Sequence, residues 1–248
     1  MSPQLSVVIP AFNEAERIIP SLQKVREFIQ SQNLTTEVLV VNDGSKDGTS
    51  EAVKSQISSF KSPATLQLLE NPSNRGKGYS VRHGILRSKG DLVLFSDSDF
   101  SSPIEEFHKL AAPLKAGEAS IAIGSRAVKG SQVNTHQPWI RESSGRFFNL
   151  VVRAVSGLPF RDTQCGFKLF TRQAADAVFP LLTVEGFGFD VEILYVARKL
   201  RLRTVEVPVV WNDSEGTRVR FLSDGAHMLM DLMRVHYQDL NGKYNGRN

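Results

Sequence analysis

Two aspartates separated by a single residue follow a short apolar run in the first half of the chain. The run Leu92–Phe95 has the composition of a buried strand, and Asp97 and Asp99 come just after it. Side chains two positions apart on an extended segment point the same way, so these carboxylates repel each other unless a positive group lies between them. Mg²⁺ and Mn²⁺ prefer hard oxygen ligands of this kind. The pair predicts a divalent metal site; the alternative is that Asp99 only caps the helix expected after Pro103.

Polar residues also follow two earlier apolar runs, in the segments Pro10–Glu14 and Asp43–Ser45. In open parallel sheets, ligands bind beyond the carboxyl ends of the strands. Asp43 and Glu14 are therefore candidates to accept hydrogen bonds from a base or a ribose. The alternative is that both serve only in turns and caps, because Asp-Gly and Asn are common turn formers.

Several basic residues are candidate ligands for an anion. Lys77 stands out because it lies between two glycines, which allow a close approach of the backbone to a ligand. The alternative for any single lysine or arginine is a solvated surface charge. The chain has no phosphate-binding G-x-x-x-x-G-K-[ST] motif. The candidates are Arg75, Lys77, Arg82, Arg126, Lys168 and Arg218.

Strands that alternate with helices must position these residues. This order predicts an α/β domain with right-handed crossovers and a largely parallel sheet. The expected strands are Leu5–Pro10, Glu37–Val41, Leu66–Leu69, Asp91–Phe95, Ser120–Gly124 and Thr204–Val209. The expected helices begin at Asn13, with Glu16 completing a capping box, and near Asp47, and others span Gly76–Arg87, Ile104–Lys115, about 141–156, about 190–199 and about 222–237. Residues 127–140 are expected to form a mobile loop, and 162–170 a loop followed by a strand.

Composition and charge narrow the class of protein. The chain of 248 residues carries a net charge of +4, which suits anionic partners but gives no support to nucleic-acid binding. Its single cysteine, Cys165, excludes an internal disulfide and a cysteine zinc site. No signal peptide and no membrane-spanning stretch are recognisable. We therefore expect a cytoplasmic protein that is soluble or peripheral on the cytoplasmic face of a membrane.

Taken together, these segments resemble the inverting family 2 glycosyltransferases. The resemblance rests on SVVIPAFNEAERI, VLVVNDGSKDGT, NRGKGYSVRHGI, DLVLFSDSDFSSP, IGSR and DTQCGFKLFTR, which occur in the expected order. DTQCGFKLFTR, FDVEILYVARK and VPVVWNDSEGTRV look most like dolichyl-phosphate glucose synthases, with dolichyl-phosphate mannose synthases as close relatives. The resemblance implies one α/β domain of the GT-A fold, a Rossmann-like, mostly parallel sheet flanked by helices. About 1–126 would bind the nucleotide sugar and about 127–248 the acceptor.

The resemblance also implies roles for individual residues. Asp97, Asp99, Arg126 and Asp190 would be catalytic, with Asp97 and Asp99 holding Mg²⁺ or Mn²⁺ and Asp99 the main ligand. Asp190 would lie near the reacting sugar, and Arg126 would face the sugar or the acceptor phosphate. The substrate-binding residues would be Pro10, Phe12, Glu14 and Asp43 at the base and ribose, Lys77 with Asp97 near the diphosphate, and Gln164, Lys168 and Arg218 around the phosphates. One departure is Ser101, which stands where some mannose synthases offer a glutamine to the metal.

The implied reaction is transfer of a hexose, with glucose expected, from a uridine diphosphate sugar to a polyprenyl or dolichyl phosphate. The alternatives are mannose transfer from GDP-mannose, a transferase of the same fold with a soluble acceptor, and a nucleotide-sugar-binding protein without activity. A lipid tail needs an apolar surface. The expected helix at 141–155 and the stripe of Leu222, Ala226, Leu229 and Met233 on the last helix would lie at a membrane surface or belong to the core.

Overall fold

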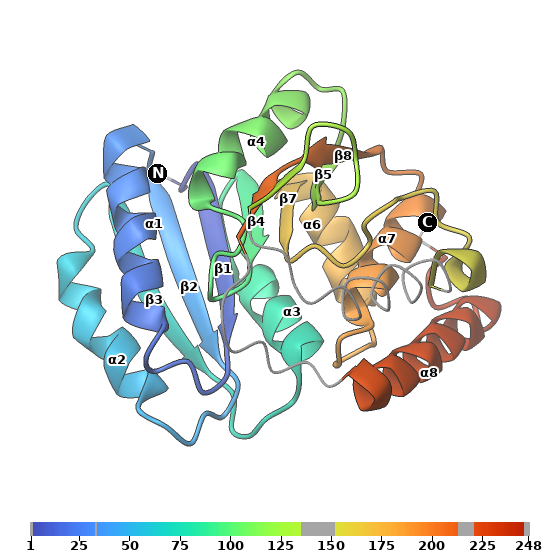
Figure 1. The fold of residues 1–248 in the computed structure, drawn as a ribbon, viewed down its shortest axis with the longest axis horizontal. Coiled ribbons are helices and arrows are strands. Elements are labelled where there is room, and N and C mark those ends of the chain that lie inside the picture. Colours follow the sequence, from blue (N-terminus) through green and yellow to red (C-terminus); the bar gives the residue numbers. More distant parts are fainter. Residues whose placement is uncertain (1, 33, 135–151, 213–220, 246–248) are drawn as a thin grey trace.

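The computed structural model describes residues 2–32, 34–134, 152–212 and 221–245. Their strands form a seven-stranded sheet in the order β3-β2-β1-β4-β7-β5-β8 (Figure 1). These strands are β1 (Leu5–Ala11), β2 (Thr36–Asn42), β3 (Ala64–Glu70), β4 (Leu92–Ser96), β5 (Ile121–Ser125), β7 (Phe167–Thr171) and β8 (Thr204–Pro208). A second, two-stranded sheet pairs β6 (Gln132–Val133) with β9 (Val210–Trp211).

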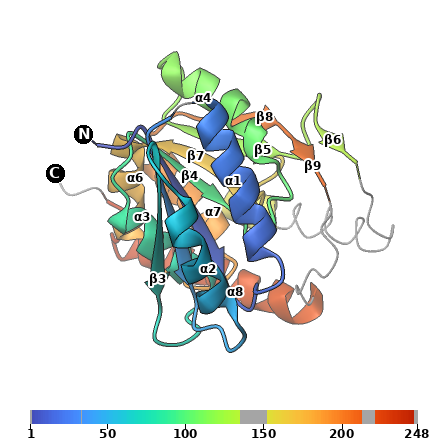
Figure 2. The same ribbon diagram turned by 90° about the vertical axis from the view of Figure 1, so that its left-hand side faces the viewer.

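Helices cover both faces of the large sheet (Figures 1 and 2). One face carries α1 (Ile18–Gln32), α2 (Thr49–Gln56) and α4 (Phe107–Lys115), the last preceded by a 3-10 turn at Ile104–Glu106. The other carries α3 (Lys77–Arg87), α6 (Arg172–Val178), α7 (Phe189–Lys199) and α8 (Phe221–Leu240). Further 3-10 turns lie at Ile57–Ser59 and Phe179–Leu181.

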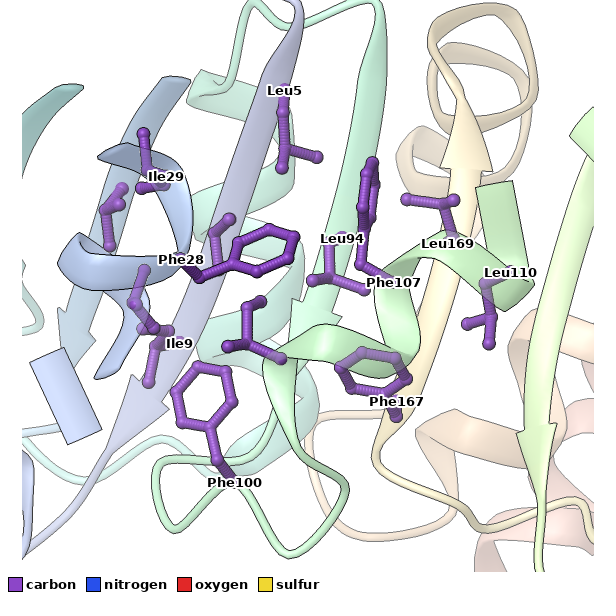
Figure 3. Close-up of a cluster of buried hydrophobic side chains, with 14 of the residues drawn as sticks. Leu5, Ile9, Phe28, Ile29, Leu94, Phe100, Phe107, Leu110, Phe167 and Leu169 are labelled. Carbon is purple, nitrogen blue, oxygen red and sulfur yellow. The ribbon is translucent and has the colours of Figure 1, made fainter. Parts of the chain in front are cut away.

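Strand β1 shows why the sheet lies between two cores. Its side chains alternate, so that Leu5, Val7 and Ile9 join the cluster under α1 and α4 while Val8 joins the cluster under α3 and α7. Figure 3 shows the first cluster, in which the ring of Phe28 from α1 meets that of Phe107 from α4 at 6.0 Å between centroids. A strand buried on both faces is mostly apolar, which is why such runs are recognisable in the sequence.

Strand β7 is the exception to a parallel sheet. It runs antiparallel to β4 and to β5, while the other neighbouring pairs of the large sheet are parallel. Because of this direction, β7 begins at the sheet edge where β4 ends. Phe167 pairs with Ser96, and the Asp97 amide donates to the Gly166 carbonyl at 3.0 Å. The segment before β7 is thereby placed beside the aspartate pair.

The order of strands and helices confirms the expected α/β class, and the structure corrects several local expectations. The α1 helix begins at Ile18 and not at Asn13, so the capping-box prediction was wrong. Asn13 has a φ of 56° and joins two loops instead, its Oδ1 accepting from the Lys46 amide at 2.9 Å and its amide donating to Ser45 Oγ at 2.8 Å.

The expected loop at 127–140 is in part the strand β6, which pairs with β9 far along the chain. Helix α6 was not predicted at all; the Thr171 hydroxyl caps it by accepting from the Ala174 amide. In the expected helix at 141–156 the structure describes a helical segment at 152–156, and residues 141–151 lie outside the described residues. Among the described helices, none combines the length and apolarity needed to cross a bilayer.

Candidate active site

Asp97 and Asp99 lie half-buried beyond the carboxyl end of β4. Asp97 Oδ1 forms an ion pair with Lys77 Nζ at 2.6 Å, and Asp99 Oδ1 accepts a hydrogen bond from the Ser101 amide at 3.0 Å. The capping alternative for Asp99 was wrong, because this bond closes a turn before the 3-10 helix at Ile104–Glu106, which has no side-chain cap. A single carboxylate has room for a further ligand, so this hydrogen bond leaves the metal hypothesis open.

Lys77 is the first residue of α3, and its position depends on the glycines on either side. A Cβ on Gly76 would lie 2.4 Å from the Glu185 carbonyl oxygen, and one on Gly78 would lie 2.6 Å from Phe189 Cβ. Gly76 also has a φ of 103°, which side chains rarely adopt. Burial alone would lower the pKa of the Lys77 ammonium, but the nearby Asp97 and Asp190 outweigh it and raise this pKa. Lys77 therefore remains a cation.

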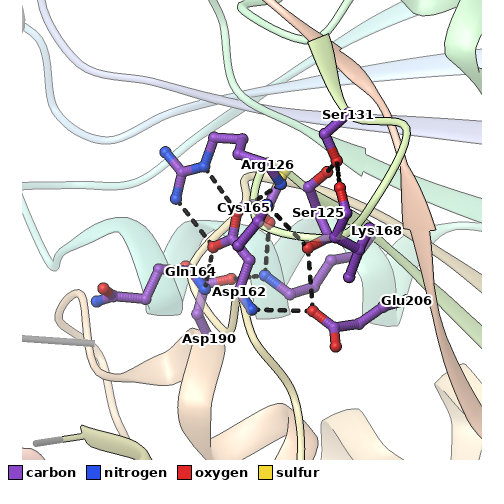
Figure 4. A network of polar contacts seen from close by, with 11 residues as sticks. Ser125, Arg126, Ser131, Asp162, Gln164, Cys165, Lys168, Asp190 and Glu206 are labelled. Atoms are coloured by element: carbon purple, nitrogen blue, oxygen red, sulfur yellow. Dashed lines mark hydrogen bonds and ion pairs between the residues drawn. The ribbon is translucent and has the colours of Figure 1, made fainter. Parts of the chain in front are cut away.

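A second lysine–aspartate pair lies next to the first and is closed to solvent. Lys168 Nζ, on β7, donates to Asp190 Oδ1 at the start of α7 and to the Cys165 carbonyl at 2.6 Å (Figure 4). Both side chains are almost fully buried. Burial raises the pKa of Asp190 above its ordinary value, and the attraction of Lys168 and Lys77 only partly offsets this rise. The electrostatic interaction between Lys77 and Asp190 joins the two pairs into one cluster.

Arg126 and Asp162 form the third ion pair at this edge. The Arg126 Nε and Nη2 atoms donate to the two carboxylate oxygens at 2.7 and 2.9 Å, and the Arg126 amide adds a bond of 3.0 Å (Figure 4). Burial would raise the pKa of Asp162, but Arg126 outweighs it and holds this pKa below its ordinary value. About a third of the Arg126 side chain is exposed, so the guanidinium can still meet an anion.

Asp43, expected at a base or ribose, forms hydrogen bonds with the segment that leads to α3. Its buried carboxylate accepts from the Arg75 amide at 3.0 Å, the Gly76 amide at 2.8 Å and Asn71 Nδ2 at 2.7 Å. Asp43 thus holds the turn that carries Lys77. Sequence reasoning missed Asn71, although an asparagine followed by proline at a strand end is a recognisable turn signal.

The remaining predicted residues lie at the same edge or outside the described residues. Pro10 lies in β1 and Phe12 follows that strand with its side chain exposed; the Asp43 amide donates to the Ala11 carbonyl beside them. The Glu14 carboxylate receives two hydrogen bonds of 2.8 Å from Arg17. Gln164 contacts Met228 of α8 through its amide. Arg218 lies outside the described residues.

The carboxylate oxygens of Asp97 and Asp99 fit a divalent cation whose coordination shell is completed by the substrate. Asp97 Oδ1 is buried and has no hydrogen bond within the described residues besides its ion-pair contact with Lys77. Among those residues no group of three or more His, Cys, Asp or Glu side chains could hold a metal alone. Mg²⁺ commonly binds through one or two carboxylates together with substrate phosphates and waters. A cation bound here would therefore share phosphate oxygens with an anionic substrate.

Comparison with known proteins decides the family. Residues 6–179 match the family described as Glycosyl transferase family 2. The chain is a family 2 glycosyltransferase. It is 37% identical to a dolichyl-phosphate beta-glucosyltransferase of Trichomonas vaginalis, over 92% of this chain and 69% of that protein. It is 34% identical to the dolichyl-phosphate beta-glucosyltransferase of Dictyostelium discoideum, over 96% of this chain and 75% of that protein.

Solved structures agree on the fold of this glycosyltransferase. A glucosyl-3-phosphoglycerate synthase from Mycobacterium tuberculosis, crystallised with Mn²⁺, UDP-glucose and phosphoglyceric acid, superposes with a TM-score of 0.68 at 19% identity. The match covers 99% of this chain and 81% of that one. A mannosyl-3-phosphoglycerate synthase from Rubrobacter xylanophilus gives a TM-score of 0.68 at 16% identity, over 99% and 76% of the two chains. The expectation of a single GT-A domain is thereby confirmed.

Proposed function

We propose that this glycosyltransferase transfers glucose from UDP-glucose to the phosphate of a dolichyl or related polyprenyl phosphate, with inversion and with the help of Mg²⁺ or Mn²⁺. The observation that carries the proposal is the identity of 34–37% with dolichyl-phosphate beta-glucosyltransferases over more than nine tenths of the chain. In this proposal about 1–126 bind the donor and about 127–248 the acceptor.

The cations at the sheet edge support a reaction between two anions. Lys77 would bind the donor diphosphate from the turn before α3, and Arg126 would bind the acceptor phosphate from the end of β5. These side chains belong to different segments, so they can hold two mutually repelling substrates against each other. A divalent cation on Asp97 and Asp99 would neutralise charge on the leaving diphosphate.

The acceptor needs little activation by a base. The second pKa of a phosphate monoester is about 6, so the group is largely dianionic at neutral pH. Its oxygen attacks the anomeric carbon as the bond from that carbon to the diphosphate oxygen breaks, which inverts the configuration. The electron pair leaves with the nucleoside diphosphate. Asp190 lies beside Lys77 and the buried Lys168, where we propose that it attracts the Lys77 ammonium and keeps it in place for the substrates.

We further propose that α8 brings the enzyme to the cytoplasmic face of a membrane. Its exposed large side chains Met230, Met233, Tyr237 and Leu240 lie three or four residues apart, which places them along one side of the helix. The stripe expected from the sequence was wrong: Leu229 packs against the core while Met233 is 63% exposed. The side chains of Leu222 and Ala226 lie outside those described. Amphipathic helices with such a face bind membrane interfaces.

Donor turnover is the test of the reaction. Purified protein with Mg²⁺ or Mn²⁺ and a short-chain polyprenyl phosphate should give lipid-linked glucose from UDP-glucose and none from GDP-mannose. Product from GDP-mannose alone would overturn the choice of sugar. Release of nucleotide without lipid product would indicate a soluble acceptor, and nucleotide binding without turnover would indicate an inactive binder.

Sedimentation with vesicles tests the membrane contact separately. The protein should sediment with vesicles that contain anionic lipid. A variant with Met233→Gln and Leu240→Gln should remain in the supernatant while still folding. Equal sedimentation of the two proteins would overturn the role of α8.

A further inference from the structure

Glu192 is a fully buried carboxylate that no step of the proposed reaction uses. It lies on α7 two residues after Asp190 and has no exposed surface. Its Oε1 atom accepts from the Thr183 amide and the Thr183 hydroxyl, both at 2.8 Å, and from the Tyr244 hydroxyl at 2.6 Å. Its Oε2 atom accepts from the Val184 amide at 2.9 Å. Every recorded bond to this carboxylate therefore comes either from the 183–184 segment or from the end of the chain.

Glu192 holds the loop at 183–186, and this loop supports the turn at 75–79 that carries Lys77. The Glu185 carbonyl accepts from the Tyr79 amide at 3.2 Å, and the Glu185 carboxylate forms an ion pair with Arg75 at 2.6 Å. The glycines at 76 and 78 face the carbonyl oxygens of Glu185 and Val184, at distances that leave no space for a Cβ. A shift of this loop must therefore move Lys77, because backbone contacts backbone without a flexible side chain between them.

Tyr244 links this loop to the turn that follows α8. The turn after α8 is closed by hydrogen bonds from the Gly242 amide to the Asp239 carbonyl and from the Lys243 amide to the Gln238 carbonyl. It places the Tyr244 ring in the core with 1% of its surface exposed. Burial, together with the neighbouring Glu192 carboxylate, raises the pKa of Tyr244, so the hydroxyl keeps its proton and remains a donor.

We propose that Tyr244 is a positioning residue for the donor site: through Glu192 and the 183–186 loop, its hydroxyl holds the Lys77 turn where it binds the nucleoside diphosphate. The link to binding rests on the proposed function, while the mechanical link from Tyr244 to the turn does not. Figure 1 shows the elements concerned: α8 lies beside α7, and α3 lies on the same face of the sheet.

The chain offers a matched control for removal of this hydroxyl. Tyr195 donates to Asp239 at 2.7 Å, and its ring lies 6.1 Å from that of Tyr244. Tyr195→Phe therefore removes a phenolic hydrogen bond to a carboxylate in the same region, without touching the 183–186 loop. Both substitutions keep the aromatic ring, and Tyr195→Phe should cost less stability because Asp239 keeps its ion pair with Lys199.

Hydrogen exchange of the intact protein tests the mechanical link. In Tyr244→Phe we expect backbone amides at 184–186 and at 76–79 to exchange about tenfold faster than in the wild type, since a buried carboxylate loses a donor. In Tyr195→Phe both segments should exchange at the wild-type rate. Thr183→Val removes another donor from the same oxygen and should reproduce the effect of Tyr244→Phe, including in the event that the latter does not fold. Unchanged exchange at 76–79, or equal effects of the two tyrosine variants, would overturn the proposal.

Titration with UDP and steady-state kinetics then test the consequence for the donor site. Tyr244→Phe should weaken UDP binding and raise the donor KM about tenfold, with kcat and the acceptor KM within about twofold of the wild type. A merely structural loss would instead lower kcat through a smaller folded fraction and leave the donor KM unchanged, and this result would overturn the positioning role. Absence of nucleotide binding by the wild type would contradict the proposed function, while the exchange experiment would still decide the link from Tyr244 to the turn.

Discussion

Lys168 and Asp190 form an ion pair in the core of the protein although 22 positions separate them in the chain. Lys168 comes from the antiparallel strand β7, at a position that pairs with Phe95 of β4 and Ile123 of β5. Asp190 comes from the first turn of α7. The pair thus connects the central strand β7 to helix α7. Asp190 also interacts with Lys77, which forms the neighbouring ion pair with Asp97.

Breaking this buried pair should be costly, while replacing it as a whole should not. Lys168→Met leaves the Asp190 carboxyl buried without its partner, and we expect the free energy of unfolding to fall by about 3–5 kcal/mol. The double variant Lys168→Met with Asp190→Leu should recover most of this loss but remain inactive. Urea denaturation with activity assays measures both. As a control, Lys54→Met breaks an exposed pair and should change stability by less than about 1 kcal/mol. A double variant no more stable than the single one would contradict this prediction.

Asp99→Asn tests the metal hypothesis. The substitution keeps the acceptor for the Ser101 amide but removes the negative charge. Turnover should fall at least about 10²-fold, because the leaving diphosphate loses its neutralising cation. Titration with Mn²⁺ in the presence of UDP should show a matching loss of metal affinity. Asp91→Asn, an exposed change at the other end of β4, is the control and should have no effect. Normal Mn²⁺ binding by the Asp99 variant would remove Asp99 from the site.

Gly166→Ala should displace the Asp97 side chain. A Cβ at this position would lie 2.0 Å from Asp97 Oδ2, so the carboxylate must move away from Gly166, which disturbs its ion pair with Lys77. We expect a loss of turnover of about tenfold or more, with a rise in the donor KM. Gly48→Ala is the matched control because its Cβ would meet no atom closer than 3.9 Å. Steady-state kinetics measure turnover and the donor KM of the two variants. Equal activities would show that the site tolerates the displacement of Asp97.

The ion pair of Asp162 with Arg126 should contribute to the free energy of unfolding, and this contribution should be lost in acid. The pKa of Asp162 in the folded protein is lowered from 3.8, so the stability that it contributes is complete above this value. It disappears as the pH falls through the folded pKa, because the carboxyl is then protonated and Arg126 loses its partner. The urea midpoint of the wild type should therefore fall as the pH drops below about 4.

The Asp162→Asn variant should be less stable than the wild type by at least about 1.5 kcal/mol at pH 7. Below about pH 4 its decline should be shallower than that of the wild type. Asp176→Asn, at an exposed pair with Arg172, should follow the wild-type curve throughout. Parallel curves for the wild type and the Asp162 variant would show that another group carries the acid sensitivity.

Most strands could be predicted from the sequence, including the one expected at the end of the 162–170 segment, while the place of β7 in the sheet and its direction could not. Leu5–Ala11 and Thr36–Asn42 are buried along their whole length, and each contains an uninterrupted apolar stretch, at 7–9 and at 38–41, that can be recognised whatever its neighbours are. The direction of β7 has no such local signal, because the pattern of Phe167–Thr171 is the same in a parallel and an antiparallel pair. The helix start predicted at Asn13 was wrong for a related reason. Asn13 forms hydrogen bonds with Ser45 and Lys46, which come close to it only in the folded protein.

The sequence by itself determined which chemistry was possible: carboxylates in pairs at the end of an apolar run, a lysine between glycines, and an order of segments that is specific to one family. The tertiary structure decided which charges meet. Lys77 faces Asp97, Lys168 faces Asp190, and Asp43 holds the turn before α3. The physical reason is that ion pairing depends on distance in space, and this distance is set by strand order and by the one strand that runs against its neighbours.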